Sequence, residues 1–289
     1  MNTVTVDTSD DAPDSGADER KAIARAVNHG RLVVFLRIAV AVVSLAGWEL
    51  SVRAGAVDPF FFSQPSAIYE QLAVWLTEGT AQGPLWHELL ITMEETAVGF
   101  LIGSALGIVF GIALGRNKLA SDVFSLYIKV ANAIPRVVLG SIFIIMFGLG
   151  MASKVALAVV MVFFVVFGNA FQGVREADKN LIANAHILGG SKRQITFTVV
   201  FPSALTWILA SLHVSFGFAL VGAVVGEFLG ARHGIGLLIA TAQGTFNAAG
   251  VFAAMIVLAV VALAAEYLLT AIENKLLKWQ PPQFAEHGM

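Results

Sequence analysis

The stretch NLIANAHILGGSKRQITFTVVFPSAL, at residues 180–205, is a polar interruption between two almost continuous apolar runs. The run before it is MASKVALAVVMVFFVVFGNAF (151–171), and the run after it is TWILASLHVSFGFALVGAVVG (206–226). The interruption contains a Gly-Gly pair, a hydrophilic Ser-Lys-Arg-Gln sequence and Pro202. A loop of this composition between two membrane-length apolar runs predicts an ordered connection outside the bilayer.

The composition is that of a membrane protein. The 289 residues are 57% hydrophobic and 13% charged, and their mean hydropathy is +0.78. Soluble domains carry about 25% charged residues. The chain has no cysteine, which excludes disulfides and thiolate metal sites.

Six apolar stretches are long enough to cross the roughly 30 Å of hydrocarbon in a bilayer. We therefore predict an all-α, polytopic membrane protein with six transmembrane helices. The predicted spans are residues 32–52, 89–114, 123–149, 154–171, 203–226 and 251–272.

The distribution of cations sets the predicted orientation, because Lys and Arg are enriched in cytoplasmic loops. With the N-terminus inside, only Arg53, Lys154 and Arg232 fall outside. Both termini are therefore expected in the cytoplasm. The cations assigned to the cytoplasmic side are Arg20, Lys21, Arg25, Arg31, Arg116, Lys118, Arg175, Lys179, Lys192, Arg193, Lys275 and Lys278.

The predicted division of the chain follows from these spans. Residues 1–30 are polar and are expected to form a disordered cytoplasmic tail, because the apolar run that follows is a retained span and not a cleaved signal. Residues 31–88 hold the first span and an external loop, for which a helix at the membrane interface and an ordinary loop are both open. Residues 89–273 form the core, with a connecting loop at 173–202, and 274–289 are a cytoplasmic tail.

Five glycines recur at every fourth position of the second span. On a helix they lie on one face, and glycine in a helix costs about 1 kcal/mol relative to alanine in water, so another helix must approach this face closely. The partner is either the same span of a second copy, in a homodimer, or another span of the same chain, which we favour. The five are Gly99, Gly103, Gly107, Gly111 and Gly115.

Polar residues within the spans are candidates for a translocation path or gate, since such groups usually face a bundle interior or water. Asn132, Pro135 and Arg136 lie together in the third span, and Pro135 removes a backbone donor. Glu227 ends the fifth span, and the glycine-rich residues after it favour a re-entrant or gate-lining segment. For each of these residues, a structural role stays open.

The segment at 178–202 reads as a helix, a sharp turn and a second helix. Asp178 is a suitable N-cap, and Gly189 with Gly190 supplies the conformation that helix ends prefer. Ser191 to Gln194 has the capping-box form, and Pro202 falls where the fifth span begins. An amphipathic face is expected from Leu181, Ile182, Ala185 and Leu188. Because so short a helix is marginal alone, we favour a docking surface for a partner over a merely well-formed loop.

This segment resembles the EAA motif of type I ABC importer permeases, E-A-A-x3-G-x9-I-x-L-P. The E-A-A positions correspond to Ala183, Asn184 and Ala185, the glycine to Gly189, and the final I-x-L-P to Val199-Val200-Phe201-Pro202. The motif's glutamate is absent. The resemblance implies a loop that couples to an ATPase subunit through Ala183, Asn184, Ala185, Leu188, Gly189 and Pro202.

Further segments resemble the nitrate/sulfonate/taurine branch of these permeases. They are FFSQPSAIYEQL (61–72), TMEETAVGFLIGSALGIVFGIALG (92–115), IPRVVLGSIFIIMFGLGMASKV (134–155) and GEFLGARHGIGLLI (226–239).

The resemblance implies a non-enzymatic subunit in a bacterial inner membrane. Its expected partners are a second copy in a homodimer, two cytoplasmic ATP-binding subunits, an extracytoplasmic solute-binding protein and lipid, with no nucleic acid. The chain has no G-x-x-x-x-G-K-[ST] loop, so ATP and Mg are expected on the partners, and this chain is expected to bind no cofactor or metal.

A small, anionic solute is expected to move inward by alternating access. Nitrate, sulfonates, taurine, aromatic carboxylates and vitamin precursors all stay open as solutes. The alternative function is an ion-coupled secondary transporter, a class in which internal repeats and buried carboxylates are frequent.

Overall fold

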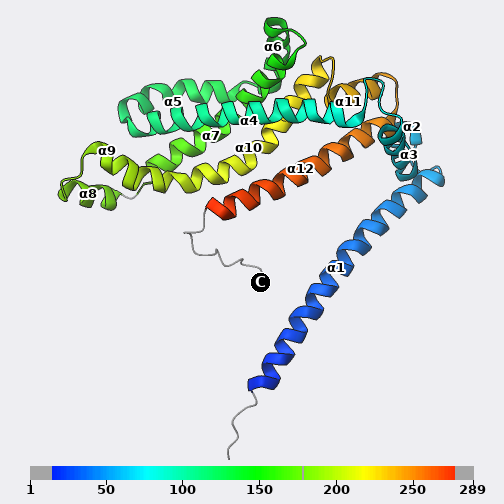
Figure 1. Ribbon diagram of the computed structural model, residues 1–289, viewed down its shortest axis with the longest axis horizontal. Coiled ribbons are helices and arrows are strands. Elements are labelled where there is room, and N and C mark those ends of the chain that lie inside the picture. Colours follow the sequence, from blue (N-terminus) through cyan, green and yellow to red (C-terminus); the bar gives the residue numbers. More distant parts are fainter. Residues whose placement is uncertain (1–14, 178, 277–289) are drawn as a thin grey trace, which may run out of the picture. The chain divides into compact units, whose positions relative to one another are not determined.

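The computed structural model describes residues 15–177 and 179–276, which form helices and no named strand (Figure 1). The chain divides into two units, Met1–Pro59 and Phe60–Met289. The first unit holds α1 (Ser15–Arg53). The later helices are α2 (Pro59–Phe62), α3 (Pro65–Thr77), α4 (Leu85–Arg116), α5 (Lys118–Ala133), the 3-10 helix η1 (Arg136–Val138), α6 (Leu139–Phe147), α7 (Met151–Arg175), α8 (Lys179–Ile187), α9 (Lys192–Ile195), the π-helix η2 (Thr196–Val200), α10 (Phe201–Leu229), α11 (Ile235–Gly244) and α12 (Ala248–Leu276).

Helix α1 begins earlier than the sequence indicates. Residues 15–30, expected within a disordered tail, are helical and continue without a break into the first span. This part of the chain is rich in Ala, Arg, Lys and Glu, which are strong helix formers, and it contains no proline that would end the helix. The rest of the expected N-terminal tail, residues 1–14, and most of the C-terminal one, 277–289, lie outside the described residues.

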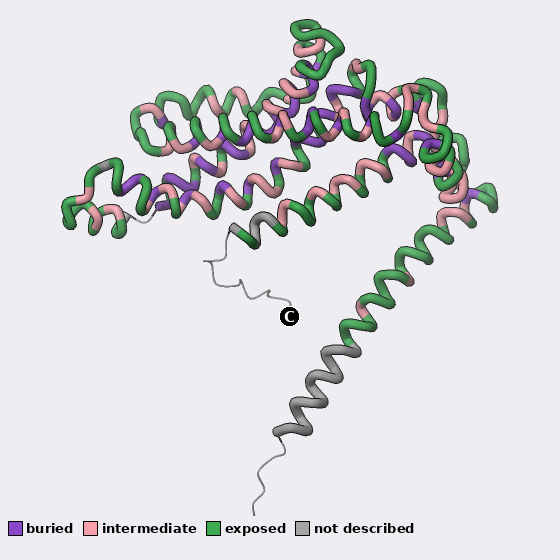
Figure 2. The backbone as a smooth tube through the Cα atoms, viewed as in Figure 1, coloured by how far each residue is buried: buried purple, intermediate pink, exposed green. Residues whose placement is uncertain are grey.

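The core of the second unit is built from α4, α7 and α10, which pack side by side. The buried residues gather where these three helices face one another (Figure 2). Helix α7 is central, because it contacts α4 along one face and α10 along another. Ala158 of α7 is fully buried between Gly99 of α4 and Gly222 of α10.

The five glycines of α4, which we call the glycine ladder, pack against α7 of the same chain. A Cβ atom added at Gly103 would lie 2.8 Å from the carbonyl oxygen of Val159, and one at Gly107 would lie 2.8 Å from the Cβ of Val166. The ladder therefore packs against another span of the same chain, which is the alternative that the sequence favoured. The two helices run parallel, and the residues of α7 that meet the ladder are also spaced by four: Ala158, Val162, Val166, Ala170 and Val174.

The third predicted span is not a single helix. Helix α5 ends at Ala133, η1 begins at Arg136, and the two parts are bent by 74°. Pro135 disfavours helical backbone in the residue before it, and Ile134 is accordingly extended, with φ −73° and ψ 126°. The span predicted over 123–149 is therefore broken at Pro135, a residue whose missing backbone donor tends to kink a helix.

Five described helices are long and apolar enough to cross a membrane, and the number rises to six if the bent pair forms one span. The fifth span is longer than predicted, because α9, η2 and α10 run on from Arg193 to Leu229. The glycine-rich segment after Glu227 contains α11, a short apolar helix. The loop at 53–88 contains the amphipathic helix α3.

Replacing Gly107 tests the ladder. We expect Gly107→Leu to destabilise the protein by about 3 kcal/mol or more, because the backbone of Phe163 and Phe167 lies within contact distance and cannot yield as a side chain can. Gly168→Leu in α7 is the matched control, since a Cβ there meets no atom of the described residues within 4 Å. Unfolding of both variants in detergent checks this, and equal stabilities would contradict close packing at the ladder.

Candidate functional site

A rigid turn joins α8 to α9 at one end of the second unit (Figure 1). Gly190 N donates to Ala185 O at 3.0 Å, and Gly189 N donates to His186 O at 3.0 Å. Gly189 has a φ of +80°, which glycine adopts without strain. This pair of bonds is the Schellman motif, so the predicted glycine-dependent helix end is confirmed.

The start of α9 is also fixed by its own side chains. Gln194 N donates to Ser191 Oγ at 3.3 Å, and Ser191 N donates to Gln194 Oε1 at 2.9 Å. The predicted capping box is therefore confirmed. The π-helix η2 follows, in which Phe201 N donates to Thr196 O, and Pro202 lies in the first turn of α10.

Helix α8 has one face toward the core and one face exposed. Ile182 packs against the buried cluster that includes Val174 and Val200. Leu181, Ile187 and Leu188, which we call the α8 surface, are exposed, and Ile187 and Leu188 are 83% and 86% accessible. The predicted amphipathic face is thus corrected: Ile182 and Ala185 are partly buried, whereas Leu181 and Leu188 point outward. Ala183 and Asn184 of the motif are also exposed.

The expected path residues Asn132, Pro135 and Arg136 lie at the α5–η1 break. Arg136 Nη2 donates to Asn132 Oδ1 at 2.6 Å, and the guanidinium lies 4.9 Å from the ring centroid of Phe164. Asn132 and Pro135 are exposed in the single chain.

Glu227 makes its contacts elsewhere. It lies fully buried at the end of α10, where it helps hold the start of α11. The structure therefore does not bring Glu227 together with the three residues at the break.

Three buried side chains, Glu88, Thr92 and Glu227, cap the N-terminus of α11, and we call them the α11 cap. Gly234 N donates to Glu88 Oε2 at 2.6 Å, Ile235 N donates to Thr92 Oγ1 at 2.9 Å, and Gly236 N donates to Glu227 Oε2 at 2.7 Å. Thr92 Oγ1 in turn donates to Glu227 Oε1 at 2.7 Å. All three side chains are fully buried.

The α11 cap satisfies a strong physical requirement. The first N–H groups of a helix have no partner inside it, and its N-terminus carries a partial positive charge that favours carboxylates. Gly234 and Gly236 allow the approach, because a Cβ at either position would collide with Glu227 or with the carbonyl oxygen of Val224. The cap thus joins α4, α10 and α11 at the end of the core opposite α8.

Lys154 is a further buried charged residue at the α11 end of the core. The sequence assigns it to the external side, at the start of a span, and in the structure it is buried, with only 1% of its surface exposed. Its Nζ donates to Leu149 O at 2.6 Å and to Gly150 O at 3.1 Å, and it interacts electrostatically with Glu95 and Glu227. The first turn of α7 is therefore tied to the loop after α6.

Sequence reasoning missed Glu88 and Thr92. Their spacing carried a signal, because Glu88, Thr92 and Glu95 follow one another at i, i+4 and i+7 on one face of a helix in an otherwise apolar span. Their common partner, the N-terminus of α11, lies more than a hundred residues away in sequence and is visible only in the fold.

Removing the Thr92 hydroxyl tests the cap. We expect Thr92→Val to lower stability by about 2–4 kcal/mol, because it leaves Ile235 N–H buried without a partner and removes the hydroxyl group that donates to Glu227. Thr96→Val is the control, since the Thr96 hydroxyl donates to Thr92 O within its own helix and not to α11. Hydrogen exchange at Ile235 should accelerate only in Thr92→Val, and equal exchange in both variants would contradict the cap.

Comparisons with known proteins agree with this architecture. Residues 103–278 match the family described as binding-protein-dependent transport system inner membrane component. The putative aliphatic sulfonates transport permease protein SsuC of Bacillus subtilis is 31% identical, over 82% of this chain and 85% of that protein. The taurine transport system permease protein TauC of Escherichia coli is 27% identical, over 85% and 90%.

Among solved structures, an inward-facing form of the MetNI methionine ABC transporter matches with a TM-score of 0.57 and 17% identity. The match covers 67% of this chain and 94% of that one. The resemblance found in the sequence is thereby confirmed, and an ion-coupled secondary transporter is not favoured. This chain belongs to the family of binding-protein-dependent inner membrane transport components, the permease subunits of ABC transporters.

Proposed function

We propose that this chain is the permease subunit of an importer that moves a small organic anion into the cell by alternating access, driven by ATP hydrolysis on separate subunits. The observation that carries the proposal is the α8 surface. It presents exposed apolar side chains on a helix whose opposite face is fixed to the core through Ile182. Such a helix is suited to receive force from a partner and to transmit it.

The orientation follows from the cations near the α8 end. Arg116, Lys118, Arg175 and Arg193 belong to turns and helix ends near this side of the second unit, and the positive-inside rule then favours a cytoplasmic location for it. Both termini would then be cytoplasmic. The α3 and α11 end would face outward, where a solute-binding protein would dock.

The coupling step starts at the α8 surface. Two ATPase subunits, which carry ATP and Mg, would each hold one α8 and move it as they close. Because the Schellman turn and the capping box fix α8 to α9, α8 and α9 move together. Ile182 then passes the displacement to α7 and α10. The glycine ladder leaves no free space between α7 and α4, so α4 follows.

A second copy of the chain would complete the path. Helices α5 and α6 carry large exposed apolar residues, among them Tyr127, Val130, Ile145 and Met146, which lipid and a second copy would cover.

The path would then pass the α5–η1 break, where Arg136 has no carboxylate ion-pair partner within the described part of the chain. An unpaired guanidinium suits an anion, and two relatives are named for sulfonates and taurine. Binding of organic anions to the cognate soluble protein tests the solute class.

A charge on the α8 surface tests the coupling role. We expect Leu188→Asp to abolish co-purification of the ATPase subunits and to reduce solute-stimulated ATP hydrolysis at least about tenfold, because an apolar anchor in a docking interface contributes about 2 kcal/mol or more. The fold should survive, since Leu188 is 86% exposed.

Leu119→Asp is the matched control. Leu119 is 76% exposed in the first turn of α5, at the same end of the unit, but outside α8. It should retain both the ATPase subunits and stimulated hydrolysis. If Leu188→Asp retained them as well, α8 would not be the docking helix.

A further inference from the structure

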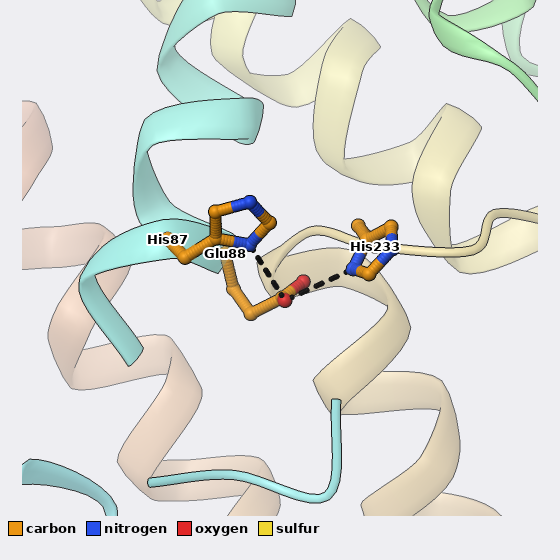
Figure 3. Close-up of side chains that lie close together, drawn as sticks. All are labelled: His87, Glu88 and His233. Carbon is orange, nitrogen blue, oxygen red and sulfur yellow. Dashed lines mark hydrogen bonds and ion pairs between the residues drawn. The ribbon is translucent and has the colours of Figure 1, made fainter. Parts of the chain in front are cut away.

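Two histidines and a glutamate converge beside the α11 cap. His87 and Glu88 are neighbours in the first turn of α4, and His233 lies in the loop between α10 and α11 (Figure 3). His87 Nδ1 lies 3.3 Å from Glu88 Oε1, and His233 Nδ1 lies 3.1 Å from the same oxygen. The three atoms all lie within 4.8 Å of one another. The two imidazole rings stand edge to face, with centroids 5.5 Å apart.

These separations match those of metal ligands. Zinc binds imidazole nitrogen at about 2.0–2.1 Å and carboxylate oxygen at about 2.0–2.2 Å with tetrahedral geometry, so two of its ligand atoms are about 3.3–3.5 Å apart. The distance from Glu88 Oε1 to His87 Nδ1, 3.3 Å, lies at the edge of that range, and the distance to His233 Nδ1, 3.1 Å, is about 0.2 Å shorter. Rotation of the rings would bring both nitrogens onto the ion, and the 46% exposure of each histidine side chain leaves room for that rotation.

The surroundings of Glu88 favour ligation over a simple hydrogen bond. Its side chain is fully buried, and its other oxygen, Oε2, accepts a bond from Gly234 N at 2.6 Å. The carboxylate is therefore held in one orientation with Oε1 directed at both rings. Such a second interaction is the usual device that orients a metal-binding carboxylate. The exposed rings on the other side leave an entry path and room for a water as fourth ligand.

We propose that His87, Glu88 and His233 bind one divalent transition-metal ion, of which zinc is the expected occupant. Two imidazoles and one carboxylate form a donor set that binds transition-metal ions in preference to magnesium or calcium. The ion would join the N-terminus of α4 to the loop before α11. It would therefore reinforce, from the solvent side, the same contact that the α11 cap makes from within.

Cobalt binding to the purified full-length chain tests the site. The protein is prepared with a tag that contains no histidine and titrated with Co²⁺, whose visible absorption reports coordination by nitrogen and oxygen ligands. We expect one Co²⁺ per chain, displaced by Zn²⁺. His87→Gln and His233→Gln should each weaken binding about tenfold or more, because ligand losses exceed the 10–100-fold effects of outer-shell changes. Zn²⁺ should also slow hydrogen exchange at residues 230–236.

His213→Gln is the matched control. His213 of α10 also contacts a glutamate, Glu266 of α12, but these two residues are not part of a three-ligand cluster within residues 15–177 and 179–276. It should bind Co²⁺ as the unchanged chain does, and the folding of all variants is checked by their helical circular dichroism. Absence of the absorption bands, or equal affinity in His87→Gln, His233→Gln and His213→Gln, would overturn the proposal and leave the cluster as a hydrogen-bonded group.

Discussion

The contact between α4 and α7 is the constraint on which the rest of the structure depends. Five glycines on one helix meet alanines and valines at the same spacing on a parallel neighbour, and the backbones approach until a single added carbon would collide. In a membrane, packing of this kind replaces the hydrophobic force that water supplies elsewhere. Helix α10 closes on the other face of α7 at Gly222 and Gly226. The three helices therefore form a block with little freedom to slide.

The two ends of this block are stabilised by different interactions. At one end, local backbone hydrogen bonds form the turn between α8 and α9, and Ile182 packs α8 against the ends of α7 and α10. At the other end, buried side chains of α4 and α10 hold the start of α11 by charge-assisted hydrogen bonds. Packing joins the two ends without a flexible element between them. A displacement at α8 would consequently reach the α11 cap as a movement of the whole block.

The parts of the fold that could be predicted from sequence are those governed by local rules. Gly189, Ser191 and Gln194 act within a few residues of one another, and the spacing of the ladder follows from helix geometry alone. The missing backbone donor of Pro135 indicated a disturbance of the third span, but the 74° bend there is visible only in the fold. The α11 cap was missed because its donors and acceptors lie on segments far apart in sequence. Gly234 and Gly236, in the glycine-rich segment after Glu227, are explained only by the contact that the Glu227 side chain makes with them.

The distance between α4 and α10 tests most directly whether the block moves as one body. Spin labels at Leu101 and Val214, which are 64% and 57% exposed, would report it in the reconstituted transporter, with the doubly labelled chain diluted by unlabelled chain. The account predicts the same distance in the nucleotide-free and ATP-bound states, while labels at Leu101 in two different copies change their separation. A distance within one chain that changes with nucleotide would contradict it.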